Sequence, residues 1–320
     1  MVATNMPVIS APKPRREQRG IALITAMLVT AIAATAAVNM ASRQQIDFRR
    51  SENLFGADQG YLFALGVESW ASQILRRDAQ EGNIDSLDED WAVTLPPIAV
   101  EGAVLSGGIE DLQSRFNLNN LIKNNAVSEP DLKRFKRLLK NLEIDEAVAD
   151  AVLDWLDSDT SPLLPDGAED VDYLILSPGY RTANAPLVSP SELLLIKGID
   201  QAAFEKLEPY VQCVPVRTSI NVNTAPPAVL MMLADGLTQA DAEQIRDDRT
   251  DKHFDSASEF TNLPVIKGLG QNFTDISVTS HYFMVRANTE YGHSRVQATI
   301  ILSRNDKGQT ETILRSQGGY

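Results

Sequence analysis

Carboxylate side chains crowd one short segment of this chain in a pattern that suits a metal ion. Seven fall within nineteen residues that contain no lysine or arginine: Asp154, Asp157, Asp159, Asp166, Glu169, Asp170 and Asp172. Carboxylates this close repel one another and raise each other's pKa values, and a hard divalent cation relieves the repulsion. Pro162, Pro165 and Gly167 interrupt the run, so we expect a loop and not a charged helix face.

Calcium is the ion that this pattern favours. The alternation of Asp157 and Asp159 is similar to the first ligands of a calcium loop, although the spacing is not that of an EF-hand and no bidentate glutamate follows at the twelfth position. A solvated acidic loop is the alternative. The predicted ligands are drawn from Asp154, Asp157, Asp159, Asp166, Glu169 and Asp170.

Catalytic motifs do not stand out elsewhere. His253, His281 and His293 are scattered, and the sequence has no GxSxG, HExxH or phosphate-loop motif. Acidic pairs are common enough to leave a membrane-tethered hydrolase open, but none is singled out. We therefore expect a protein that is not an enzyme.

An uncharged run near the N-terminus has the length of a membrane anchor, which would hold the rest of the chain, including the acidic segment, at a membrane. Basic residues precede Gly20, and the 22 residues from Ile21 to Ser42 carry no charge. As one helix they would rise roughly 33 Å, against a hydrocarbon core of about 30 Å. This run is too long for a cleaved secretory signal, whose apolar core has about 7 to 15 residues. Lysine and arginine before the span (Lys13, Arg15, Arg16, Arg19) predict that this end stays cytoplasmic and that the bulk of the chain crosses the membrane.

Hydrophobic periodicity predicts a helix, then strands, a helical segment and strands again. Phe63, Val67, Trp70 and Ile74 share one helix face beyond the span. Strands are predicted over 92–95 and 98–105, separated by Pro96-Pro97 and closed by Gly107-Gly108. Further strands are expected over 275–280, 282–290 and 294–303, with a turn at 291–293. Helical spacing fills the middle, as in Leu132, Phe135, Leu138 and Leu139, and again in Val148, Val152, Trp155 and Leu156.

A faint internal repeat runs through the helical segment. Residues 116–120 (FNLNN) return as residues 220–224 (INVNT). Each copy is followed later by a Ser-x-x-Glu element, at 189–192 and at 256–259, which predicts a capping box that begins a short helix. We expect a duplicated helical module between about 112 and 268.

The junction at Gly20 resembles a known processing signal. Arg19-Gly20 followed by Ile21-Ala22-Leu23-Ile24-Thr25 is similar to the prepilin leader of type IV pilins and type II secretion pseudopilins. In that family a peptidase cuts after the glycine on the cytoplasmic side and methylates the new N-terminus. The family usually has glutamate at the fifth mature position, where this chain has Thr25. With residues 41–45, 154–173 and 219–224, the resemblance covers essentially the whole chain and is to the minor pseudopilin K family, which lacks that glutamate.

The resemblance implies an α+β fold, in which a long N-terminal helix packs on an antiparallel sheet and a large all-α domain is inserted. The implied parts are a leader (1–20), a transmembrane helix (21–42), a pilin body (43–111 and 269–320) and the inserted domain (112–268). The implied function is a minor pseudopilin at the tip of the type II secretion pseudopilus, which helps to start its assembly. Its partners would be I-type and J-type minor pseudopilins, the prepilin peptidase and the inner membrane, with the bulk of the chain periplasmic.

The net charge argues against a protein that binds nucleic acid. The chain carries a formal charge of −14, and removal of residues 1–20, which hold four basic residues and one acidic residue, makes it −17. Two glycine turns, 195–199 and 266–269, are similar to those of helix-hairpin-helix modules, so a membrane-anchored DNA-uptake protein is the alternative. Such modules need a basic surface, whereas residues 140–210 are acidic, so no nucleic-acid partner is expected. The single cysteine, Cys213, cannot form an intrachain disulfide and is expected to be a small packed residue.

Overall fold

The computed structural model describes residues 19–270 and 273–318. It separates into two compact units that divide between Phe55 and Gly56. Lys13, Arg15 and Arg16 of the predicted leader lie outside the described residues. The domain limits expected at residues 20, 42, 111 and 268 stay predictions.

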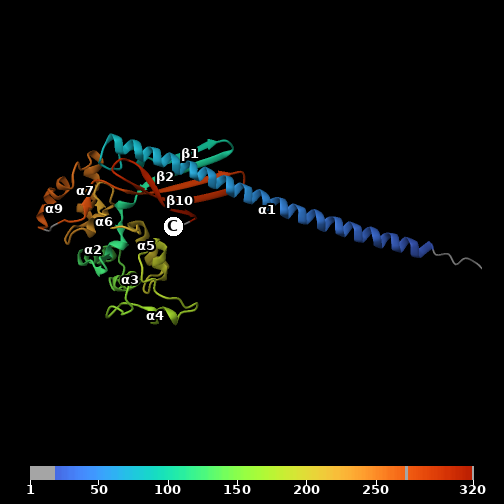
Figure 1. Cartoon of the computed structure of the whole chain (residues 1–320), viewed down its shortest axis with the longest axis horizontal. Helices are drawn as coiled ribbons and strands as arrows, with labels where there is room; N and C mark the ends of the chain where they lie inside the picture. Colours follow the sequence, from blue (N-terminus) through green and yellow to red (C-terminus); the bar gives the residue numbers. More distant parts are fainter. Residues whose placement is uncertain (1–18, 271–272, 319–320) are drawn as a thin grey trace, which may run out of the picture. The chain divides into compact units, whose positions relative to one another are not determined.

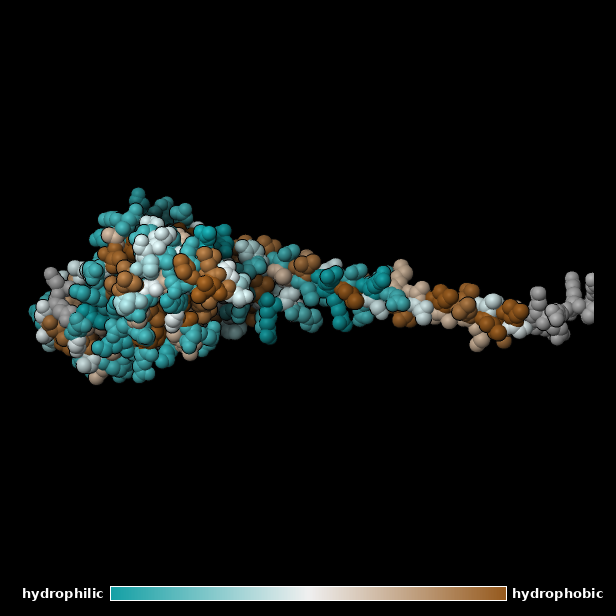
Figure 2. Space-filling model, turned by 90° about the horizontal axis from the view of Figure 1, so that it is seen from below, coloured by the Kyte–Doolittle hydropathy of each residue, from teal (hydrophilic) through white to brown (hydrophobic). Residues whose placement is uncertain are grey.

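Helix α1 (Arg19–Glu81) supplies the described part of the first unit. From Gly20 onward it is long and apolar enough to cross a membrane once, and its apolar window is not buried by other residues. Figure 2 shows hydrophobic side chains, in brown, along this end of the helix. The threonines in the apolar run bond back to their own helix, as Thr35 Oγ1 does to the carbonyl oxygens of Ala31 and Ile32 at 3.0 and 2.9 Å. Such bonds hide a hydroxyl that would otherwise be unpaired in hydrocarbon.

The second unit contains the remaining elements (Figure 1). Its α-helices beyond α1 are α2 (Glu129–Asn141), α3 (Val148–Leu156), α4 (Asp170–Leu174), α5 (Gln201–Leu207), α6 (Pro227–Met232), α7 (Gln239–Asp251), α8 (Ala257–Thr261) and α9 (Pro264–Gly268). Its 3-10 helices are η1 (Asp90–Ala92), η2 (Leu112–Ser114), η3 (Leu118–Leu121), η4 (Pro190–Leu195) and η5 (Glu208–Tyr210). Its strands are β1 (Leu95–Val100), β2 (Ala103–Asp111), β3 (Phe116–Asn117), β4 (Ile122–Lys123), β5 (Ala126–Val127), β6 (Val211–Gln212), β7 (Ile220–Asn221), β8 (Ile276–Ser277), β9 (Tyr282–Tyr291), β10 (Ser294–Arg304) and β11 (Thr310–Gln317).

Strands β1, β2, β9, β10 and β11 form an antiparallel sheet in that order, and the C-terminal part of α1 packs on one face of it (Figure 1). The helix buries Ala64, Val67, Ala71 and Leu75 against sheet residues such as Phe283. The predicted helix face is confirmed in part, because Val67 is buried and the partly buried Trp70 and Ile74 pack against this core. The centre of the buried face lies about one residue further along the helix than predicted. This arrangement confirms the α+β class.

Two glycines bring α1 close to β10. A Cβ at Gly56 would lie 2.3 Å from Ser294 Oγ, and a Cβ at Gly60 would lie 2.7 Å from Val296 Cγ2. Real Cβ atoms do not approach so closely in a packed interior, so only glycine fits without a shift. The register of α1 on the sheet thus depends on residues with no side chain, which a search for large apolar residues overlooks.

The first hairpin differs from the prediction. Strand β1 runs through Pro96-Pro97, with an irregular register between Leu95 and Ile98, and its turn is at Glu101-Gly102, where both residues have positive φ. Proline is tolerated because β1 is an edge strand. Gly107 lies inside β2, where a Cβ would meet the Arg286 carbonyl oxygen at 2.1 Å. The C-terminal hairpin of β9 and β10 turns at the predicted residues, but residues 275–280 supply only the short β8, and β11 was not predicted.

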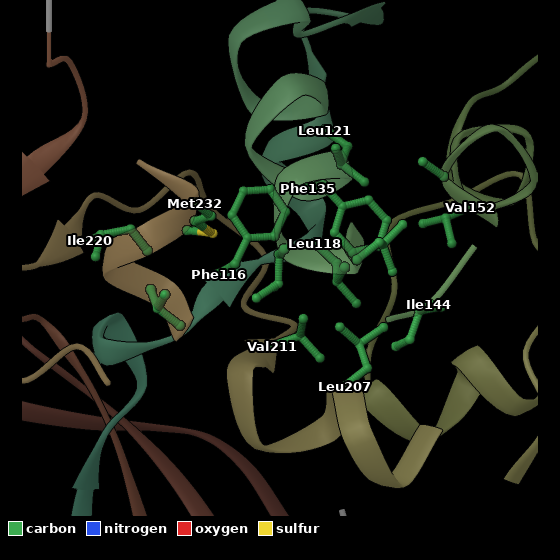
Figure 3. Packing of buried hydrophobic residues seen from close by; sticks show 14 of the residues in the cluster. Phe116, Leu118, Leu121, Phe135, Ile144, Val152, Leu207, Val211, Ile220 and Met232 are labelled. Carbon is green, nitrogen blue, oxygen red and sulfur yellow. The ribbon is translucent and has the colours of Figure 1, made fainter. Parts of the chain in front are cut away.

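A second hydrophobic core fills the helical segment (Figure 3). Helices α2 and α3 form where the spacing predicted them, and Phe116 stacks on Phe135 with ring centroids 5.7 Å apart. The segment also contains the short strand pairs β3–β6 and β4–β5, and its strand β7 pairs with β8 beyond residue 268, so the expectation of helices alone was incomplete. Cys213 is buried, as expected of a small packed residue.

The internal repeat is visible in the hydrogen bonds. Asn119 Oδ1 accepts from Leu187 N at 2.8 Å and its Nδ2 donates to Leu187 O at 2.9 Å. Asn223 makes the same pair of bonds with Phe254, at 2.9 and 3.0 Å. We call each pair an asparagine clamp. Each clamped residue lies two positions before the serine that caps the next short helix, Ser189 for η4 and Ser256 for α8.

Candidate functional site

Three carboxylates of the acidic segment converge. Asp157, Asp159 and Glu169 each offer an oxygen, and these oxygens lie within 4.8 Å of one another. Asp157 ends α3 as its C-cap, and Glu169 is the N-cap of α4, so the two helix ends hold the ends of the loop. We call these three residues the carboxylate triad.

Asp154 does not belong to the triad, because its carboxylate holds the loop backbone. It is fully buried in α3, and its oxygens accept from Leu163 N at 3.1 Å and from Ala168 N at 2.7 Å. A Cβ at Gly167 would lie 2.1 Å from Asp154 Oδ2, so the loop passes this carboxylate only with glycine there. Hydrogen bonds to the loop backbone therefore already occupy the Asp154 carboxylate, which competes with its predicted role as a metal ligand.

The remaining predicted ligands are spread around the triad. Asp170 Oδ1 accepts from the backbone N–H and hydroxyl of Thr182, and its Oδ2 pairs with Arg181 at 3.2 Å. Asp166 is exposed. Asp172 pairs with Lys197 at 2.9 Å. The acidic segment is also less of a loop than predicted, since Asp154 lies in α3 while Asp170 and Asp172 lie in α4.

Two buried polar atoms beside the loop have no hydrogen-bond partner among the described residues. One is Oε1 of Glu169, whose other oxygen accepts from Thr182 Oγ1 at 3.0 Å. The other is Oδ1 of Asn184, whose Nδ2 donates to the Asp159 carbonyl at 3.0 Å. Asn184 lines the same cavity as Asp157 and Asp159. Asn184 was not predicted from the sequence, because it lies 25 residues from Asp159 and carries no charge.

The electrostatics of the triad favour a cation. Burial raises the pKa of Asp157 and of Glu169, and repulsion from Asp159 acts in the same direction on both. Burial likewise raises the pKa of Asp154 to about 6, although two backbone N–H groups oppose it. Unpaired oxygen atoms and mutually repelling carboxylates are what a hard divalent cation binds, so the residues present fit calcium.

The three residues predicted to act in processing and assembly, Gly20, Ile21 and Thr25, lie in the first turns of α1. The role of Gly20 and Ile21 in processing stays a prediction. Thr25 Oγ1 lies 3.0 Å from the carbonyl oxygens of both Ile21 and Ala22. Its hydroxyl is therefore satisfied within the helix.

Comparisons with known proteins define the class to which this fold and anchor belong. The family model described as "Type II secretion system (T2SS), protein K" matches residues 114–216, and a second model with the same description matches residues 220–279. Type II secretion system protein K of Pseudomonas aeruginosa is 35% identical over 315 residues, which cover 95% of this chain and 94% of that protein. The protein of the same name from Aeromonas hydrophila is 31% identical, with 95% and 98% covered.

The fold agrees with these matches. A crystal structure of the GspK-GspI-GspJ complex from the enterotoxigenic Escherichia coli type 2 secretion system contains a similar chain, with a TM-score of 0.76, 23% identity, 85% of this chain covered and 100% of that chain. The chain belongs to the type II secretion system protein K family. It is thus a minor pseudopilin, a structural component of the secretion system and not an enzyme, and the apolar helix is consistent with a single-pass membrane anchor. Family membership disfavours the DNA-uptake alternative.

Proposed function

We propose that this minor pseudopilin forms the tip of the pseudopilus and helps to start its assembly. The observation that carries the proposal is Thr25, which satisfies its own hydroxyl on α1. A carboxylate at this depth costs about 3 kcal/mol on insertion scales, so it is kept only where a partner offsets the cost. In pseudopilins that have glutamate here, the partner is thought to be the N-terminal amine of a neighbouring subunit. A first subunit has no subunit above it to pair with, and Thr25 needs none.

The size of the second unit supports the same position. Its helical segment has a hydrophobic core of its own, from Phe116 to Ile266. A domain of this bulk, repeated along a thin helical filament, would clash with its neighbours, whereas at the tip it meets solvent or the outer machinery. The alternative is that Thr25 is a neutral substitution tolerated anywhere in the filament.

I-type and J-type minor pseudopilins are the proposed partners at the tip. The similar solved chain belongs to a complex that its title names GspK-GspI-GspJ. We further propose an inner-membrane location, with the second unit in the periplasm, because basic residues precede the span. Prepilin peptidase would cut between Gly20 and Ile21 and methylate Ile21.

Calcium is the proposed structural ion of the second unit. Asp157, Asp159 and Glu169 would hold it, with the unpaired oxygens of Glu169 and Asn184 as the support for this assignment. A bound cation would fix the end of α3 to the start of α4 across the loop, since the triad joins these two helix ends. Asp154 would hold the loop around the ion.

Electron microscopy of labelled filaments tests the tip position. A gold or antibody label on the helical segment is expected at one end of each pseudopilus, and label along the shaft would refute the proposal. Replacement of Thr25 with glutamate is the companion variant, and replacement of Thr30, which also bonds back to its own helix, is the control. Only the Thr25 variant should move the label into the shaft or reduce the number of filaments.

A further inference from the structure

A cavity lies between α7 and the turn that follows α1. Its volume is about 520 Å³, and its walls include Leu87, Pro226 and Pro227 on the apolar side and Arg246 and Arg249 on the charged side. Leu87 is 58% exposed, so the cavity can be reached from solvent. The volume is within the range of small-ligand pockets. Neither the carboxylate triad nor the anchor contributes to it.

Arg249 is the unusual residue of this cavity. Its side chain is almost completely buried, with 7% of the residue exposed, and its Nη1 donates to the Val222 carbonyl at 2.7 Å. It forms no ion pair with any residue of 19–270 or 273–318. Burial and the nearby charge of Arg246 lower the pKa of Arg249 to about 10, which leaves it a cation at neutral pH. Buried charges are normally paired, because desolvation of an unpaired charge is costly.

The other polar groups of the cavity wall are already engaged. Ser86 Oγ donates to Asp88, and Thr224 Oγ1 donates to Asp111 at 2.5 Å. Thr250 Oγ1 donates to the Arg246 carbonyl at 3.0 Å. Arg246 itself pairs with Asp247 at 2.7 Å. Arg249 is therefore the group whose charge is left for a ligand to match.

We infer that this cavity binds a carboxylate that carries an apolar group, as presented by a peptide with an aliphatic residue beside its carboxylate. The guanidinium of Arg249 would receive the carboxylate, and Leu87, Pro226 and Pro227 would cover the aliphatic group. Asp88 lines the same cavity, so its negative charge disfavours a dianion such as a phosphate monoester. The size of the cavity and its apolar wall disfavour a bare inorganic anion.

Titration of the full-length protein in detergent tests this inference. The probes are N-acetyl-leucyl-leucine, its C-terminal amide, N-acetyl-glutamyl-leucinamide and sodium acetate. Ligand-observed NMR measures the binding of each probe. Saturable binding of the free acid, at least tenfold tighter than that of the amide, is the expected result. A preference for the glutamyl probe would show that the site binds a ligand's side-chain carboxylate and not its C-terminal carboxylate. Equal binding of acid and amide, or binding of acetate as tight as that of the peptides, would overturn the inference.

Variants place the binding in this cavity. Arg249→Gln is expected to weaken binding of the acid at least tenfold, and Arg249→Lys less. Because Arg249 also donates a hydrogen bond to the Val222 carbonyl, its replacement can disturb the packing of the interior. A second variant is therefore needed at an exposed residue of the cavity. Leu87→Asp adds a negative charge at the exposed rim and should weaken binding at least tenfold, whereas Leu62→Asp on α1, where Leu62 is also 58% exposed, is the matched control. Binding that survives both Arg249→Gln and Leu87→Asp would refute the site.

Discussion

Asn119 and Asn223 perform the same task 104 positions apart in the chain. Each side chain bonds the N–H and the carbonyl of one buried residue, Leu187 or Phe254. The preceding asparagines agree as well, since Asn117 Oδ1 accepts from Asn119 N and Asn221 Oδ1 accepts from Asn223 N. The helical segment therefore contains two copies of one motif, in which an asparagine side chain bonds the backbone of a residue two positions before a helix-capping serine.

Removal of a clamp should destabilise the second unit. Asn223→Ala leaves the buried N–H and carbonyl of Phe254 without partners, and each unpaired group costs about 1–3 kcal/mol. We expect the free energy of unfolding, measured in urea, to fall by about 2–6 kcal/mol. The control is Asn141→Ala at the exposed end of α2. Equal stability of the two variants would mean that the clamp contributes nothing.

Gly60 and Gly66 should respond in opposite directions to alanine. At Gly66 nothing lies within 4 Å of an added Cβ, so Gly66→Ala should stabilise by about 0.5–1 kcal/mol through lower chain entropy in the unfolded state. At Gly60 the new Cβ meets Val296, and overpacking should make Gly60→Ala net destabilising by about 1–2 kcal/mol. Thermal unfolding of both variants checks the sign. A stabilised Gly60→Ala would show that α1 does not need this close approach.

Calcium should stabilise the second unit through the triad. At 100 times its dissociation constant a ligand of the folded state adds about 2.7 kcal/mol. The melting temperature should therefore rise in calcium and fall in EDTA for the natural sequence and for Asp166→Asn, whose side chain is exposed. Glu169→Gln and Asp157→Asn should lose the response. If the natural sequence shows no response and elemental analysis finds no calcium, the solvated-loop alternative stands.

Glu89 should make stability depend on pH near neutrality. Burial raises its pKa from 4.5 to about 7, even though Ser86 N and Trp91 Nε1 donate to it at 2.9 and 2.8 Å. Since the folded state holds this proton at pH values where the unfolded state has released it, the contribution to stability is lost as pH rises from about 4.5 through about 7. Glu89→Gln should flatten the stability curve between pH 5 and 8. A curve with unchanged slope would contradict the raised pKa.

Periodicity predicted the elements with strong patterns and missed those set by close contact. Helices α2 and α3 and the hairpin of β9 and β10 follow directly from apolar spacing. Strand β11 was missed because it is an edge strand that alternates between exposed and partly buried residues, with no fully buried one. The face of α1 was misplaced by about one residue because Gly56 and Gly60, where an added Cβ would clash with β10, carry no hydrophobic signal.

The acidic segment shows the same limit for a site. Residue types and spacing identified the region, but which oxygens converge depends on the backbone. Asp154 points its carboxylate at the loop N–H groups of Leu163 and Ala168, and Asp166 points to solvent. Asn184 comes from a different part of the chain. Only the fold selects Asp157, Asp159 and Glu169 from the six predicted ligands.

The two asparagine clamps close loops of different length, and this bears on the order in which the segment folds. The clamp of Asn119 joins residues 68 apart, whereas that of Asn223 joins residues 31 apart. Loop-closure entropy grows with the logarithm of loop length, so the longer loop costs about 0.7 kcal/mol more to close. The C-terminal copy should therefore nucleate first and offer a formed surface on which the N-terminal copy condenses, although the ribosome releases the N-terminal copy earlier.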